Sequence, residues 1–338
     1  MGIRACLNVY DVTSGKNLDA KTVSGASIVV IASGRTATQL RRTSARRSPS
    51  HRGDWRLAVI LILPATAGFC VFAAYPTIRG IYLSFTNFRI LSPPTWAGLA
   101  NYRHLFADDV FWHSLRVTVY FVALTVGVGL AVSLVSAVIL HRLTQSTVIR
   151  GLVLLPFLIS GVVAALVWQW MLDPGLGIIN VVVKAVIGHN ILFLGSQGWV
   201  IPSLSFIAIW KSMGYNAILI FAGLQTIPSE IYEAGRLDGA GEIRMFTRLT
   251  LPLLRPIMAM VIILTIISSF QVFDLVAVTT KGGPANASNV LPLYIYDTGF
   301  AEFNFGYALT MSMALFVLLL AITFFQMRLL RANDSDTT

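Results

Sequence analysis

Charged residues are scarce in this sequence of 338 residues, because Asp, Glu, Lys and Arg together make up only 12% of it. A typical soluble domain carries about 25% charged residues, so the composition argues against one. Hydrophobic residues make up 56% of the chain, and its mean hydropathy is +0.73. The shortage of charge therefore indicates a protein that is largely embedded in a membrane.

Cysteine is also rare, and its two copies, Cys6 and Cys70, lie far apart. This spacing provides neither a disulfide framework nor a metal-binding pattern. The sequence contains no Gly-x4-Gly-Lys-Ser/Thr loop for nucleotide phosphates, no His-Glu-x-x-His zinc motif and no signature of a catalytic serine. We therefore expect no enzymatic activity, no ATP hydrolysis and no bound cofactor or metal in this chain.

Positive charge is present but concentrated at one end. The net charge is +10, and residues 1–56 hold ten Lys or Arg against three Asp. A nucleic-acid partner is therefore not expected. Residues 1–55 are polar and rich in Ser, Thr and Arg, which predicts a disordered cytoplasmic tail that contacts anionic lipid headgroups. A translation start assigned too early is the alternative.

Beyond this tail the sequence alternates long apolar runs with short polar loops. Each run has roughly 20 apolar residues, enough to cross a hydrocarbon core of ~30 Å. We predict an all-α integral membrane fold with a six-span domain at 56–328 and a short cytoplasmic tail at 329–338. The six spans are expected at about 57–77, 117–140, 151–172, 200–224, 256–279 and 306–327.

The distribution of Lys and Arg predicts the orientation. If both termini are cytoplasmic, the cytoplasmic segments hold 18 Lys and Arg and the outer loops hold 6. Because positive residues are retained on the cytoplasmic side, we expect this orientation. It places the loop at 225–255 in the cytoplasm.

That loop has the pattern of two short helices with a break between them. Ser229 is predicted as the N-cap of the first helix, and Gly239 and Gly241 as the break. The second helix is expected from about Glu242 to Leu249, ended by Pro252. Within it, three apolar residues at i, i+3 and i+6 predict one apolar face that needs a cover: Ile243, Phe246 and Leu249.

The spacing of this loop resembles a known family. Glu233-Ala234-Gly235, then Gly239, then Leu249-x-Leu251-Pro252 is similar to the EAA loop of ABC importer permeases, which reads Glu-Ala-Ala, Gly and Ile-x-Leu-Pro at the same spacing. Two residues depart from it: Gly235 replaces the second Ala, and Leu249 replaces Ile. The resemblance implies that the loop couples the permease to a separate ATPase, through residues Glu233, Ala234, Gly235, Asp238, Gly239, Ile243, Phe246, Leu249 and Pro252.

Motifs elsewhere resemble the carbohydrate-type permeases, in particular the first permease subunit of maltose, trehalose and glycerol-3-phosphate importers. They include Tyr75-Pro76, Gly282-Gly283-Pro284 and Gly306-Tyr307-Ala308. The resemblance implies the type I ABC importer permease fold and an inner-membrane subunit for ATP-driven, binding-protein-dependent import of a sugar or sugar derivative. It also implies a second homologous permease, two ATPase subunits that bind ATP and Mg, and an extracytoplasmic sugar-binding protein.

Polar residues inside the spans predict a substrate path. Ser212 and Asn216 share a face of the fourth span, and Ser268, Gln271 and Asp274 recur at i, i+3 and i+6 in the fifth. A sugar needs hydrogen-bonding groups and a flat aromatic side chain, for which Trp168, Trp170 and Tyr215 are candidates. The predicted path therefore consists of Tyr215, Asn216, Ser268, Gln271 and Asp274. Interhelical hydrogen bonding or a Lys211–Asp274 pair that only holds the helices together is the alternative.

A different class of function also remains open, namely a secondary transporter of a small polar solute driven by an ion gradient. Asp274 and Lys211 would then be proton or ion sites. Such transporters commonly contain internal repeats, and none is evident in the sequence. A membrane-embedded enzyme is disfavoured by the missing catalytic motifs.

Overall fold

The computed structural model describes residues 9–10, 17–18, 54–90, 92–143 and 146–334, and it divides into two units, 1–68 and 69–338. In the first unit β1 (Val9–Tyr10) pairs antiparallel with β2 (Asn17–Leu18), and helix α1 (Asp54–Phe69) begins after them. The rest of the tail predicted to be disordered lies outside the described residues.

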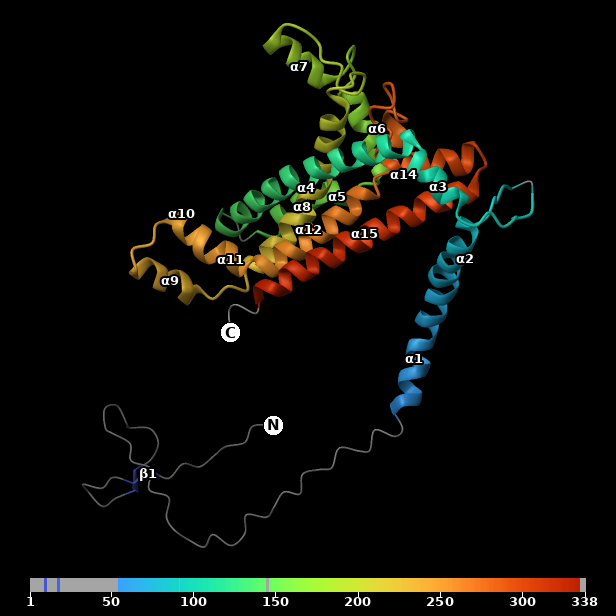
Figure 1. The fold of residues 1–338 in the computed structure, drawn as a ribbon. Coiled ribbons are helices and arrows are strands. Elements are labelled where there is room, and N and C mark those ends of the chain that lie inside the picture. The colour runs from blue at the N-terminus through green and yellow to red at the C-terminus, as the bar shows by residue number, and fades with distance from the viewer. Residues whose placement is uncertain (1–8, 11–16, 19–53, 91, 144–145, 335–338) are drawn as a thin grey trace. The chain divides into compact units, whose positions relative to one another are not determined.

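The second unit is built from helices (Figure 1). In chain order they are η1 (Cys70–Ala74), α2 (Tyr75–Ser84), α3 (Ala100–Ala107), α4 (Asp109–Leu143), α5 (Thr147–Leu158), α6 (Gly161–Met171), α7 (Ile178–Ile187), α8 (Val200–Leu224), α9 (Ser229–Leu237), α10 (Glu242–Met245), η2 (Phe246–Thr250), α11 (Leu251–Leu253), α12 (Arg255–Phe270), α13 (Asp274–Thr279), α14 (Leu291–Tyr296), η3 (Asp297–Ala301) and α15 (Phe305–Asp334). The three η segments are π-helical turns.

Five helical segments in the described residues are long and apolar enough to cross a membrane: Val59–Ser84, Asp109–Arg142, Val200–Leu224, Arg255–Thr279 and Phe305–Arg328. The predicted third span at 151–172 is instead a pair, α5 and α6, bent by 90°. Pro156, which cannot donate a backbone hydrogen bond, lies in the last turn of α5, and Ile159 and Ser160 then adopt extended backbone before α6 begins. If this pair counts as one span, the described residues hold six.

Helix α8 lies at the centre of the packing, against α4, α5 and α12 (Figure 1). Gly214 explains how α5 approaches it so closely, since a Cβ atom there would lie 1.9 Å from the carbonyl oxygen of Val153. Small residues permit such contacts between helix backbones in membranes. Around this crossing, Leu204, Ile207 and Ile220 of α8 are fully buried in two apolar clusters.

A buried carboxylate joins the helices at the start of α4. Asp108 accepts hydrogen bonds at Oδ1 from the backbone N–H groups of Val110 and Phe111, and so caps α4. Its Oδ2 accepts from the hydroxyls of Tyr294 in α14, at 2.8 Å, and Tyr307 in α15. One side chain therefore fixes the relative positions of three helices.

Candidate functional site

The first helix of the predicted coupling loop is α9, and it begins one residue earlier than expected. Pro228 occupies the N-cap position, with ψ of 141°, and Ser229 is already helical and makes no capping hydrogen bond. The prediction of Ser229 as the N-cap is therefore wrong, because a side chain caps only from the non-helical residue before the first turn. Glu230 lies in the first turn, where a carboxylate is favoured by the helix dipole.

The predicted break between the two helices is confirmed at Gly239, whose φ of +71° lies in the left-handed region that favours glycine. Gly241 then precedes α10 with ordinary backbone angles. Two large apolar side chains flank the break and are almost fully accessible: Leu237 is 89% exposed and Ile243 is 82% exposed. The motif predicted Ile243 but not Leu237, which only the exposure reveals.

The second helix does not end before Pro252. Helices α10, η2 and α11 follow one another from Glu242 to Leu253, and Pro252 lies in the first turn of α11. Proline is tolerated at that position because N–H groups of a first turn need no partner within the helix. The π-helical turn also changes the spacing of side chains, so the apolar face predicted for Ile243, Phe246 and Leu249 is divided. Ile243 is exposed, whereas Phe246 and Leu249 are half-buried.

The two residues that depart from the EAA pattern contact one another. A Cβ atom at Gly235, which is buried in α9, would lie 2.9 Å from Cδ1 of Leu249 and 3.7 Å from Cγ of Met245. The leucine side chain therefore occupies space that an alanine at position 235 would need. Gly235 and Leu249 form one packing unit that holds the two halves of the loop together.

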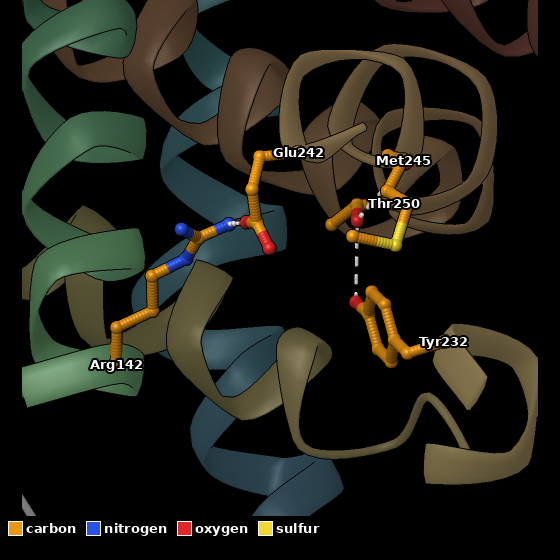
Figure 2. Close-up of polar contacts among 5 residues, drawn as sticks. All are labelled: Arg142, Tyr232, Glu242, Met245 and Thr250. Carbon is orange, nitrogen blue, oxygen red and sulfur yellow. Dashed lines mark hydrogen bonds and ion pairs between the residues drawn. The ribbon is translucent and has the colours of Figure 1, made fainter. Parts of the chain in front are cut away.

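One ion pair attaches this loop to the end of α4, and hydrogen bonds join the two halves of the loop to one another (Figure 2). Arg142 and Glu242 form an ion pair of 2.7 Å, with both side chains more than half exposed. The hydroxyls of Tyr232 and Thr250 share a hydrogen bond of 3.2 Å, and the Thr250 hydroxyl also donates to the carbonyl oxygen of Met245 at 3.4 Å. Arg142 and Tyr232 are absent from the predicted set because their partners become visible only in the fold.

These groups surround a pocket of about 370 Å³ between α4 and the loop, and Glu233 lines it together with Phe246. Of the remaining predicted residues, Ala234, Asp238 and Gly239 are exposed. The loop therefore presents its charged and apolar side chains to the surroundings, while Gly235, Met245 and Thr250 form its buried interior.

A second site is a cavity of about 310 Å³ between helices α4, α5, α8 and α12. Three of the five residues predicted for the substrate path line it: Tyr215, Asn216 and Ser268. Ser212, predicted to share a face with Asn216, lines it too. The other lining residues are Phe121, Thr125, Phe157, Ala208, Leu264, Thr265, Ser269 and Val272.

The lining carries no charged side chain and is mostly apolar, with hydroxyl and amide groups beside an aromatic wall. Tyr215 stacks on Phe157 with ring centroids 4.4 Å apart and planes inclined by 11°. Nδ2 of Asn216 lies 3.3 Å from Oγ1 of Thr265, and the buried hydroxyl of Thr125 has no hydrogen-bond partner within the described part of the chain. Hydroxyl and amide groups beside a flat ring suit a polyhydroxylated solute.

Gln271 and Asp274 lie outside this lining. Helix α12 ends at Phe270 and α13 begins at Asp274, so the break between them disrupts the regular spacing that predicted one face with Ser268. Gln271 is exposed, and the Asp274 carboxylate is beside Gly161, where a Cβ atom would lie 3.2 Å from Oδ2. No ion pair links Lys211 to Asp274, both of which the structure describes.

The tryptophans suggested as the aromatic platform also lie elsewhere. Trp168 is buried in the apolar core, where its ring centroid is 5.2 Å from that of Phe206 and 5.3 Å from that of Trp210. Trp170 is exposed at the end of α6. Of the three candidates, Tyr215 alone lines the cavity.

Comparisons with known proteins agree on one family. The family model described as "Binding-protein-dependent transport system inner membrane component" matches residues 105–334. The chain is 32% identical to the sulfoquinovosyl glycerol transport system permease protein SmoG of Agrobacterium fabrum, over 83% of this chain and 92% of that protein. It is also 32% identical to the sn-glycerol-3-phosphate transport system permease protein UgpA of Yersinia pestis, over 83% of this chain and 97% of that protein.

Solved structures share the fold. A chain of a bacterial ABC transporter involved in import of the acidic polysaccharide alginate superposes with a TM-score of 0.74 at 24% identity, covering 83% of this chain and 97% of that chain. A chain of the bacterial alginate ABC transporter in complex with a periplasmic protein that holds an alginate pentasaccharide gives 0.71 at 25% identity, covering 82% and 94%.

Proposed function

Because this chain belongs to the family of binding-protein-dependent transport system inner membrane components, we propose that it forms half of the translocation path of an ATP-driven importer for a sugar or sugar derivative. Its relatives serve sulfoquinovosyl glycerol and sn-glycerol-3-phosphate transport, and its fold is that of a chain in an alginate importer. For the choice of a sugar as the substrate, the proposal depends on the uncharged cavity that hydroxyl groups and the Phe157–Tyr215 stack line.

The partners of the proposed complex are a second, homologous permease, two ATPase subunits and an extracytoplasmic sugar-binding protein. ATP and Mg would bind to the ATPase subunits, and this chain would bind no cofactor. The complex would lie in the inner membrane with both termini of this chain in the cytoplasm. The division into a tail at 1–55, a permease domain at 56–328 and a coupling loop at 225–255 belongs to the same proposal.

The loop between α8 and α12 supports the proposed contact with an ATPase subunit. Leu237 and Ile243 project beside the Gly239 break and are almost fully exposed. Burial of these two side chains in an apolar groove of a partner would remove their surface from water, which is favourable. Glu233 and Arg236 line the neighbouring pocket and supply charged groups around that contact.

The proposed mechanism is alternating access. When ATP closes the ATPase dimer, the loop held in its grooves moves with it, and the connection through Arg142 transmits that movement to α4. The cavity between α4, α5, α8 and α12 then opens toward the binding protein and accepts the sugar. Such a switch requires that ATP-bound and nucleotide-free motors bind the two permease conformations with different affinities.

The experiment that tests the proposal replaces residues of the loop in the complete complex. We expect Glu233→Lys and Gly239→Asp to abolish sugar uptake while the helical bundle stays folded, because the first reverses a charge beside the pocket and the second strains a backbone with φ of +71°. Uptake, ATPase rate and co-purification of the ATPase subunits are measured together. Gly127→Ala in α4 is the control, since nothing lies within 4 Å of a Cβ there.

Normal uptake in both loop variants would contradict the proposal. An ion-gradient-driven transporter, the alternative function, would depend on Asp274 and Lys211 as ion sites. Neither residue lines the cavity, so no observation in the described residues favours it.

A further inference from the structure

Helix α7 (Ile178–Ile187) connects two membrane segments and carries an uncovered apolar face. Figure 1 shows it beyond the end of α6 and away from the other long helices. Ile178, Val182 and Val186 recur at intervals of four, so they lie along one face of the helix, and all three are exposed. Lys184 lies on the opposite side, near the buried Asn180. The helix is therefore amphipathic, with an aliphatic face directed away from the protein.

This helix is fixed in its orientation. Asn180 is only 1% exposed, and its Nδ2 donates to the carbonyl oxygens of Leu172 at 3.0 Å and Asp173 at 3.2 Å. Its Oδ1 accepts from the backbone N–H of Ile191 at 2.9 Å, which holds the returning chain. Gly177 packs so closely that a Cβ atom there would lie 2.4 Å from the Met171 carbonyl oxygen. These contacts aim the aliphatic face in one direction.

We propose that α7 lies flat at the membrane surface, with Ile178, Val182 and Val186 inserted among the acyl chains of the leaflet at the opposite end of α8 from α9. Continuity supports lipid as the occupant, because α7 joins α6 to α8 and so starts at the end of membrane segments. Trp170 lies at the end of α6 and Trp199 directly before α8. Both are exposed, as expected for tryptophans at the level of the headgroups.

The chemistry of the face also favours lipid over a protein partner. Its side chains are aliphatic and form no hydrogen bonds. Acyl chains need no hydrogen-bonding partner, so they can cover such a face. Protein interfaces depend on Trp, Tyr and Arg, and valine is under-represented among their most important residues. The charged residue of α7, Lys184, lies on the other side, where its ammonium group reaches the headgroups and water.

The test measures the depth of a spin label in the complete complex. Cys6 and Cys70 are replaced by Ser, Val186→Cys is labelled, and the complex is reconstituted in lipid nanodiscs. We expect the label to collide with oxygen, which concentrates in the bilayer, several-fold more often than with a water-soluble nickel chelate. Lys184→Cys is the matched control two residues away, and there the preference is expected to reverse.

Two results would overturn the inference. A label at position 186 that collides mainly with the nickel chelate would place the face in water. A label shielded from both reagents would show that protein covers it, and if the shielding appears only when the sugar-binding protein is added, that protein is the occupant. Should the Val186 variant fail to assemble, Val182→Cys on the same face gives the same measurement.

Discussion

At the scale of single residues, Asp108 explains how the ends of three helices are held together. Burial alone would raise the pKa of this carboxyl group, but hydrogen bonds from Tyr307, Tyr294 and the N–H groups of Phe111 and Val110 outweigh burial and lower the pKa below its ordinary value of 3.8. The ionised form is therefore the one that the folded protein stabilises.

The pH dependence follows from the direction of that shift. Because the folded-state pKa is lowered, the stabilisation is complete above about pH 4 and is lost as the pH falls through the folded-state pKa. We expect Asp108→Asn to lower the free energy of unfolding by about 2 kcal/mol at pH 7, as is typical of hydrogen bonds to a charged group, and the difference from the wild type to shrink below pH 4. Thermal unfolding of the purified protein at pH 7, 5 and 3 measures this.

The adjacent carboxylate provides the control for that experiment. Asp109 is exposed in the first turn of α4, so Asp109→Asn should change stability by much less than Asp108→Asn at pH 7. If the two variants behave alike, the carboxylate of Asp108 is not the group that joins α4, α14 and α15.

A second prediction at this scale concerns Gly235 and Leu249, the two residues that depart from the EAA pattern. Gly235→Ala gains about 1 kcal/mol of helix propensity but overlaps with Cδ1 of Leu249, which costs about 1 to 3 kcal/mol. We expect a net loss of stability in the wild type and a gain in a Leu249→Val background, since valine has no δ carbon. Thermal unfolding of the wild type, the two single variants and the double variant measures whether the two substitutions are coupled. Equal effects of Gly235→Ala in both backgrounds would refute the coupling.

At the scale of elements, the ion pair between Arg142 and Glu242 connects α4 to the proposed coupling loop. Both side chains are largely exposed, so the pair contributes at most about 1 kcal/mol to stability. We expect the pair to matter instead for transmitting movement of the loop to α4. Arg142→Glu should reduce uptake without unfolding the protein, and Arg142→Glu with Glu242→Arg should restore part of it. Sugar uptake per ATP hydrolysed, at low and high salt, is the measurement.

Arg103→Glu, an exposed charge reversal in α3 away from that pair, serves as the control and should leave uptake unchanged. If the reversed pair is no better than the single variant, the loop is not coupled to α4 through these side chains.

The sequence predicted where helices lie better than it predicted where they bend or break. Apolar runs revealed the spans because burial in lipid requires them, and the spacing from Glu233 to Pro252 revealed the loop. The π-helical turn at Phe246–Thr250, the passage of the helix beyond Pro252 and the break after Phe270 were missed. Each of these features replaces regular backbone hydrogen bonds by irregular ones. Neighbouring helices, rather than local propensity, decide where that is tolerated.

The residues that line the cavity could likewise be predicted only in part. Tyr215, Asn216 and Ser268 were predicted from polarity within apolar runs, and they lie together. Phe157 and Thr125 were missed because an aromatic ring or a threonine in a span gives no signal of which way it faces. Their part in the cavity depends on the crossing of α5 and α8, which Gly214 permits.

At the scale of the whole molecule, the number of crossings decides on which side each terminus lies. Two candidate spans separate the coupling loop from the C-terminus, so we expect these to share a side. Four spans separate the loop from the N-terminus if the bent pair α5 and α6 crosses the membrane, and three if it does not. We expect a membrane-impermeant thiol reagent to label Leu237→Cys and a cysteine placed at either terminus from the same side.

The labelling is carried out on right-side-out and inside-out vesicles, with Cys6 and Cys70 replaced by Ser. Labelling of the N-terminal cysteine from the opposite side would show that α5 and α6 enter and leave the membrane on one side.

The exposure of Leu237 and Ile243 has a further consequence for the cell. If the proposed contact with an ATPase subunit forms there, a copy of this subunit without that partner exposes two apolar side chains to water beside Gly239. Chaperones and proteases continuously remove proteins that are not in their native assembled state. We therefore expect the cell to keep the amount of this permease matched to its ATPase by degrading the excess.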